Sequence, residues 1–248
     1  MTFFVLSFLT AMNLINYLPE KTDATYYELR IYHCNPGKLN DLIARFQNHT
    51  TTLFEKHGMK NIGYWVPSKT DNTDLYYILS YPNKESRDLS WKNFMADPEW
   101  EKVRTKSEQN GKILASVESI FLTAEDFSPK VKKSIKSPMR TFELRTYYCL
   151  PGRLSALESR FRDHTLKLFK KHGMTNIAYW KSIEKDGSQA KLIYLLAHDS
   201  QDAAKKSFDS FRLDPEWVKA REASEKDGKM VEKVESIMMK PLSFSKYQ

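Results

Sequence analysis

One long segment occurs twice in this sequence. Residues 56–59 read Lys-His-Gly-Met, and the same four residues return at 171–174, which is 115 positions later. Toward the end of each copy the separation grows to 117, because the second copy carries two extra residues in a loop, where insertions cost least. The repeat predicts two modules of one fold, residues 25–125 and 140–248, joined by a basic linker at 126–139.

Each copy has the same predicted order of secondary structure. Short runs of Tyr, Leu and Ile indicate strands, and apolar residues at helical spacing indicate helices. Gly58 is a natural end for the first helix, and Asp97-Pro98 is typical of a helix start. In the first copy we predict strand 26–33, helix 38–57, strands 61–66 and 75–81, helix 84–95, a helix from 97 to 111, and strand 117–123. This β-α-β-β-α-β order is that of the ferredoxin-like unit.

The predicted strands carry bulky groups on both faces. Leu29 and Ile31 have one parity and Tyr32 the other, and residues 75–79 are apolar or aromatic throughout. The helices of a ferredoxin-like unit cover only one face of its sheet, so the other face needs a second cover. We therefore expect an α+β chain. Its two tandem modules pack sheet to sheet as an intramolecular pseudo-dimeric α/β barrel, with the helices outside.

Five motifs of the first copy carry a resemblance to a known family. They are Tyr-Glu-Leu-Arg at 27–30, Pro-Gly-Lys-Leu at 36–39, Arg-Phe-x-x-His-Thr at 45–50, Phe-x-Lys-His-Gly-Met at 54–59 and Tyr-Trp at 64–65. With these motifs the chain resembles the NIPSNAP family over nearly all of residues 25–125 and 140–240. The resemblance implies the dimeric α/β-barrel superfamily, in which a cavity lies between sheet and helices.

The resemblance implies no single reaction. Relatives in the superfamily include small oxygenases and haem-degrading enzymes, but no agreed activity follows for NIPSNAP proteins. Animal members are linked to mitochondria and vesicle traffic. Residues 1–24 do not fit a mitochondrial leader, since they contain no arginine, so we do not expect the animal roles here.

The charge pattern argues against nucleic acid as a partner. The net charge is +8, from 39 basic and 31 acidic residues, but the excess is not spread over one face. Four of the lysines lie close together in the linker, with no other charged residue between the first and the last of them: Lys130, Lys132, Lys133 and Lys136. In the rest of the chain acids and bases alternate, as on a solvated surface.

The N-terminal segment, residues 1–24, is apolar and has no charged side chain before Glu20. Its length is typical of a signal-peptide core rather than a membrane span, although no basic residue precedes the apolar run. We expect export to the periplasm or cell exterior, with a cytoplasmic protein as the alternative. No membrane insertion is expected beyond this segment, and a homo-oligomer is one expected state.

No metal site and no cofactor are predicted. The sequence has no His/Asp/Glu cluster with metal spacing, no P-loop, no nucleophile elbow and no dinucleotide fingerprint. Cys34 and Cys149 occupy the same place in the two copies. Two free, partly buried thiols are the expected state, and a disulfide between the copies is the alternative for an exported chain.

Two repeated sets of residues are candidates for a ligand site. Arg45 and His49 lie four residues apart on the edge of the apolar face of the first helix, where arginine could hold an anion and histidine move a proton. Structural roles are the alternative. The second copy repeats the pair as Arg160 and His164.

The second set lies on the first strand of each copy. Glu28, Arg30 and Tyr32 share one parity. If Leu29 and Ile31 face the helices, this polar set faces the space between the sheets, where a buried Glu–Arg pair either lines a cavity or serves as paired structure. The second copy repeats the set as Glu143, Arg145 and Tyr147.

Three functions remain open on the sequence. The first is a protein that binds a small, largely apolar or aromatic ligand in an α/β-barrel cavity, with or without a minor enzymatic activity. The second is a non-catalytic interaction scaffold. The third is an oxygenase acting on an aromatic or haem-like substrate, which rests on superfamily analogy alone. A cavity near Arg45 and His49 favours the first, and a filled barrel interior the second.

Overall fold

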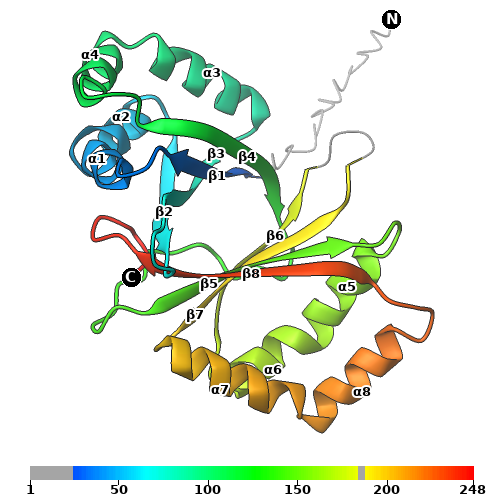
Figure 1. Ribbon diagram of the computed structural model, residues 1–248. Helices are drawn as coiled ribbons and strands as arrows, with labels where there is room; N and C mark the ends of the chain where they lie inside the picture. Colours follow the sequence, from blue (N-terminus) through cyan, green and yellow to red (C-terminus); the bar gives the residue numbers. More distant parts are fainter. Residues whose placement is uncertain (1–24, 184–187) are drawn as a thin grey trace, which may run out of the picture.

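The computed structural model describes residues 25–183 and 188–248, and its elements follow the repeat of the sequence (Figure 1). The expected signal peptide, residues 1–24, lies outside these residues. The first module contains β1 (Tyr26–Cys34), α1 (Leu39–Arg45), the π-helical turn η1 (Phe46–Thr50), α2 (Thr51–Lys56), β2 (Lys60–Pro67), β3 (Asp74–Tyr81), α3 (Lys84–Met95), α4 (Pro98–Ser107) and β4 (Leu114–Ala124).

The second module repeats this order element by element. It contains β5 (Thr141–Cys149), α5 (Leu154–Arg160), η2 (Phe161–Thr165), α6 (Leu166–Lys171), β6 (Thr175–Ser182), β7 (Lys191–His198), α7 (Gln201–Arg212), α8 (Pro215–Ser224) and β8 (Val231–Pro241). The β-α-β-β-α-β prediction is confirmed in both copies.

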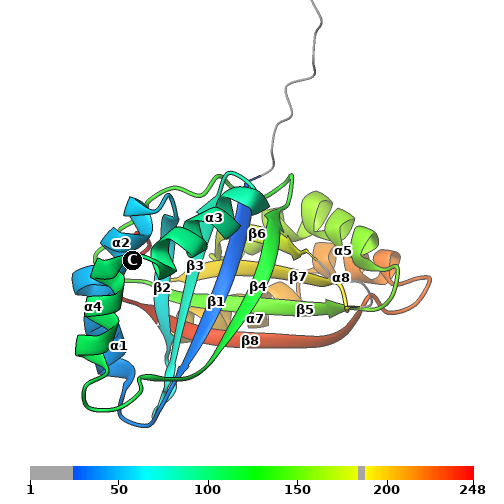
Figure 2. The ribbon, with the colours of Figure 1, turned by 90° about the horizontal axis from the view of Figure 1, so that it is seen from above.

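The two sheets join edge to edge into one closed, antiparallel barrel. The strand order is β1-β3-β2-β8-β5-β7-β6-β4, so the modules meet at two short seams, β2 with β8 and β4 with β6. The helices of each module lie outside the barrel, on opposite sides of it (Figures 1 and 2). The predicted pseudo-dimeric α/β barrel is therefore confirmed.

The barrel interior is filled by side chains of both modules. Leu29 and Ile31 point inward, where they pack in one cluster with Trp65 of the first module and Trp180 of the second. A separate apolar core lies between each sheet and its own helices. The interior of this barrel is thus a packed core.

The predicted orientation of β1 is wrong. Leu29 and Ile31 face the barrel and not the helices, so Glu28, Arg30 and Tyr32 face the helices. The physical reason is access to water. Strands close the barrel interior on all sides, which leaves no solvation for a charge, whereas the helix side stays open enough that the Arg30 side chain is 12% exposed.

Helix α4 begins where the sequence predicts a helix start. The Asp97 side chain accepts from the backbone N–H of Glu99 at 2.8 Å, and Pro98 takes the first helical position of α4. Asp97 also binds His57, at 2.6 Å from Nε2, and Lys56. Hydrogen bonds from Lys56 and His57 hold the pKa of Asp97 well below its ordinary value. The cap therefore also ties α2 to α4.

The linker at 126–139 lies along the barrel instead of hanging free. Val131 packs against the barrel core, and the Phe127 ring lies 5.8 Å from that of Tyr179. The lysines remain exposed, Lys133 among them. Both cysteines are buried, each in the outer core of its own module. Across the described residues, no helix is both long and apolar enough to span a membrane.

Candidate functional site

The first helix of each module is interrupted by a π-helical turn. In η1, Thr50 Oγ1 donates to the carbonyl of Arg45, five residues back, at 3.2 Å. A π turn takes more residues than an α turn, so side chains four apart no longer lie one above the other. Arg45 is consequently buried and His49 exposed. The turn η2 separates Arg160 from His164 in the same way.

Arg45 ties α1 to the end of α4. Its Nη1 donates to Glu108 Oε1 at 3.4 Å, and its guanidinium lies 5.2 Å from the ring centre of Trp100. In the second module, Arg160 binds Glu225 at 3.0 Å in the equivalent place. Holding the helices together is therefore a role that both arginines share.

A groove on the helix surface nevertheless runs past Arg45 and His49. This helix groove has a volume of about 570 Å³, and Lys102 and Lys106 on its rim are exposed. The side chains that line it are those of Asp41, Ala44, Arg45, Asn48, His49, Glu99, Lys102, Val103, Lys106, Ser107 and Asn110.

A second cavity lies deeper, between the sheet of the first module and its helices. This sheet–helix cavity has a volume of about 390 Å³, and Arg45 forms part of the wall of both spaces. Six aromatic rings and four arginines line it. Its residues are Arg30, Tyr32, Arg45, Phe46, Thr50, Phe54, Arg87, Trp91, Phe94, Met95, Trp100, Arg104, Glu108 and Leu114.

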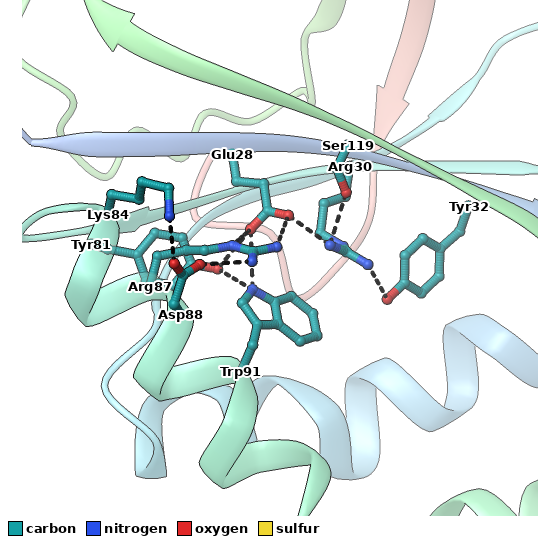
Figure 3. A network of polar contacts seen from close by, with 9 residues as sticks. All are labelled: Glu28, Arg30, Tyr32, Tyr81, Lys84, Arg87, Asp88, Trp91 and Ser119. Carbon is teal, nitrogen blue, oxygen red and sulfur yellow. Dashed lines mark hydrogen bonds and ion pairs between the residues drawn. The ribbon is translucent and has the colours of Figure 1, made fainter. Parts of the chain in front are cut away.

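The carboxylate of Glu28 anchors the polar wall of this cavity (Figure 3). It is fully buried and accepts five hydrogen bonds. Two of them come from Arg87 on α3, at 2.8 and 3.0 Å. The others come from Arg30, Tyr81 and Trp91. With so many donors, Glu28 is held as a fixed anion.

Two pKa values follow from this arrangement. Burial alone would raise the pKa of Glu28, but the hydrogen bond from Arg87 and the charges of Arg30 and Arg87 outweigh it and hold the pKa below its ordinary value. Burial, and then the negative charge of Glu28, raise the pKa of Tyr81. Tyr81 therefore stays protonated and can donate to the carboxylate.

Arg30 reaches from Glu28 toward the cavity. Its Nη1 donates to Glu28 at 2.6 Å and to Ser119 at 2.9 Å, and its Nη2 to Tyr32 at 3.4 Å. Its guanidinium lies 4.2 Å from the ring centre of Trp91 (Figure 3). The Nε atoms of Arg30 and Arg45 are buried and find no acceptor among the described residues, and a buried unpaired donor is costly.

The second module builds a different network at the same place. Glu143 is buried and accepts three hydrogen bonds from described residues: from Arg145 at 2.6 Å, from His198 at 3.0 Å and from Ser236. Tyr147 lies near Arg145 and pairs with a neighbouring tyrosine hydroxyl. In both modules, then, the predicted residue set on the first strand faces the helices, but the buried glutamate of the set has different partners.

The differences concentrate on α3 and α7. Arg87 has Ala204 as its counterpart, and Trp91 has Phe208. Met95, which lines the sheet–helix cavity, has Arg212 as its counterpart, and Arg212 lies over the Phe208 ring and pairs with Asp209. Arg87, Trp91 and Arg104 are not among the site residues predicted from the sequence. Arg87 and Trp91 stand at positions where the two copies differ, and this difference is the sequence signal that marks them.

No metal centre emerges in the part of the chain that the structure describes. Within residues 25–183 and 188–248, no group of three or more His, Cys, Asp or Glu side chains is arranged to hold a metal ion. The chemistry that this site offers is that of arginine donors, one fixed carboxylate and aromatic surface.

A family comparison agrees with the repeat. The family model described as NIPSNAP matches residues 27–129 and again residues 142–246. Protein NipSnap homolog 3B of Mus musculus is 31% identical over 84 residues. That stretch is 34% of this chain and 33% of the mouse protein, so the match spans about a third of the mouse protein's length.

Solved structures share the barrel over most of its length. A proposed monooxygenase from Lactobacillus acidophilus superposes with a TM-score of 0.58 at 13% identity, covering 88% of this chain and 94% of that one. A proposed monooxygenase from Fusobacterium nucleatum gives 0.58 at 13%, covering 89% and 93%. At this identity the likeness shows the fold alone.

Proposed function

The chain belongs to the NIPSNAP family, and we propose that it binds a small, largely apolar or aromatic ligand in the sheet–helix cavity of its first module. The observation that carries the proposal is the cavity itself. It is about 390 Å³ in volume, bounded by aromatic rings, and has a few arginines at defined places. Small-molecule sites are typically concave spaces of this size, mostly apolar, with few polar groups to orient the ligand.

The barrel interior is not the place for this ligand. Trp65 and Trp180 fill it together with the branched side chains of both sheets. A packed interior supports a scaffold role for the barrel, which holds each sheet rigid beneath its helices. The cavity lies outside it, where rigid elements can hold a binding site in a fixed shape.

The helix groove is a weaker candidate. Its rim carries Lys102, Lys106 and Glu99, all exposed, and such side chains lose conformational entropy on binding. The sheet–helix cavity offers buried rings instead, among them Phe46 and Phe54. A ligand bound there meets a wall that is already ordered, so fewer side chains lose conformational freedom on binding.

An oxygenase is the alternative activity, and the fold neighbours described as proposed monooxygenases raise it. One feature of this chain supports it, since a partly enclosed, aromatic-lined cavity would shield part of a substrate from water. Titration with haem tests for a haem-like substrate: a shifted and sharpened Soret band supports this alternative, and an unchanged spectrum counts against it.

The binding proposal is tested with N-phenyl-1-naphthylamine, an uncharged aromatic probe whose fluorescence rises in apolar sites. We expect saturable binding that is lost in Met95→Trp, which places a large side chain in the cavity wall. The matched control is Leu89→Trp, on the same helix, since Leu89 is 58% exposed and lies outside the lining. Equal binding by both variants, or no binding by the parent protein, would overturn the proposal.

A further inference from the structure

We infer that the ligand of the sheet–helix cavity is an aromatic carboxylate, held by the arginines of the first module and not by those of the second. The inference rests on the proposed function, because it names the ligand class for the same cavity. Three observations support it: the charge balance of the wall, the unpaired donors, and the differences between the two modules.

The wall of the cavity carries more positive than negative charge. Three of its four arginines, Arg30, Arg45 and Arg87, pair with two carboxylates, Glu28 and Glu108. Arg104 adds a fourth positive charge, so the wall has an excess of two positive charges. Asp88 binds both Arg87, at 3.1 Å, and Lys84, at 2.6 Å, so counting this acid together with Lys84 leaves the excess at two. In a partly enclosed space such an excess favours an anionic ligand.

The donors of this wall are not all used. Arg104 is exposed at the cavity, and no described residue forms a hydrogen bond or ion pair with its guanidinium. The buried Nε atoms of Arg30 and Arg45 also lack acceptors. Guanidinium groups present planar pairs of N–H donors that match the planar carboxylate. An acceptor-rich anion at this wall would satisfy donors that the protein leaves open.

The apolar part of the ligand follows from the remaining lining. Tyr32, Trp91 and Trp100 face the same space as the arginines. A flat aromatic body would bury against these rings, and aromatic contacts add to the area that is buried. The ligand class is thus a compact molecule with one charged end and one aromatic end.

The second module lacks several of these features. Ala204 stands in place of Arg87, which removes one positive charge, and Phe208 in place of Trp91. Arg212, the counterpart of Met95, is neutralised by Asp209 at 2.8 Å. The unpaired Nε atoms are common to both modules, since those of Arg145 and Arg160 also have no acceptor within residues 25–183 and 188–248. The asymmetry of the site therefore depends on α3 and α7.

The test compares three probes of one shape: 1-naphthoate, the uncharged 1-naphthamide and the cationic 1-naphthylmethylammonium. Calorimetric titration of the full chain should show that affinity falls from naphthoate to naphthamide to the cation. Naphthoate should bind about tenfold more tightly than naphthamide, as expected for a charge-assisted hydrogen bond. Arg104→Gln should remove most of this preference. The matched control Arg221→Gln, at the same position of α8, should keep it.

The outcomes separate this inference from the proposed function. If all three probes bind equally, or the cation binds best, the anion class is overturned while the cavity remains a binding site. If Arg221→Gln abolishes the preference and Arg104→Gln does not, the assignment to the first module is overturned. If neither naphthoate nor naphthamide binds, the proposed function fails, and this inference fails with it.

Discussion

Arg87 holds the carboxylate of Glu28 with two nitrogens, Nη2 at 2.8 Å and Nε at 3.0 Å, across the space between α3 and β1. The counterpart of Arg87 in the second module is Ala204, and there Glu143 accepts from His198 instead. The same buried glutamate thus has two sets of partners in one chain. The two halves of the pseudo-symmetric barrel therefore differ on the side that faces the helices.

Replacement of Arg87 by alanine should lower the free energy of unfolding. Glu28 keeps Arg30, Tyr81 and Trp91 as donors but loses its bidentate partner while fully buried, which costs about 1–3 kcal/mol. Urea unfolding followed by circular dichroism measures the change. Lys84→Ala is the control, since its exposed ion pair should contribute little to stability. Equal losses in the two variants would show that the ion pair with Glu28 stabilises the fold no more than the exposed pair of Lys84 does.

Stability should fall as the pH rises from about 5 to 7 because of Glu125. Burial, and then the charge of Glu158, raise the pKa of Glu125 from 4.5 to about 7, with Lys181 opposing and Asp126 adding to the rise. In this window the folded chain keeps a proton that the unfolded chain has released, so deprotonation favours unfolding. Glu125→Gln should weaken this pH dependence and be more stable than the parent at pH 8. Thermal melts from pH 5 to 8 that run parallel for both proteins would contradict the assignment.

The first module should not be stable alone. Residues 25–125 without the second copy would expose the inward face of the sheet, including Leu29 and Trp65. The outer edges of both seam strands, β2 and β4, would also lose their partners. We expect this fragment to form a dimer or to aggregate. Light scattering coupled to size exclusion reports its mass, and a soluble, well-folded monomer would contradict the pseudo-dimer.

Limited digestion with trypsin should cut first in the linker. Lys132, Lys133 and Lys136 are exposed there, between the docked Val131 and the second module. Mass spectrometry of the early products should show two fragments that correspond to the modules. First cuts inside residues 39–56 would instead show that the helix carrying η1 opens more readily than the linker.

The repeat predicted the fold because each copy must cover an apolar sheet face, and the other copy supplies that cover. The face itself could not be assigned, because Leu29 and Tyr32 are both buried, on opposite sides of β1. The turn η1 was not predicted either, because no residue type marks a π turn and α-helical spacing placed His49 beside Arg45. The differences at Arg87 were visible in the sequence but carry meaning only once Glu28 is known to face α3.

The central claim is that ligand binds beside α3 of the first module and not at the equivalent place in the second. The chain has five tryptophans, so a spectrum of 15N-labelled indole groups reports both places at once, with peaks assigned by Trp→Phe variants. On addition of 1-naphthoate, we predict shifts of the Trp91 and Trp100 signals and none of Trp217, the counterpart of Trp100. A shifted Trp217 signal with Trp91 and Trp100 unchanged would contradict the account.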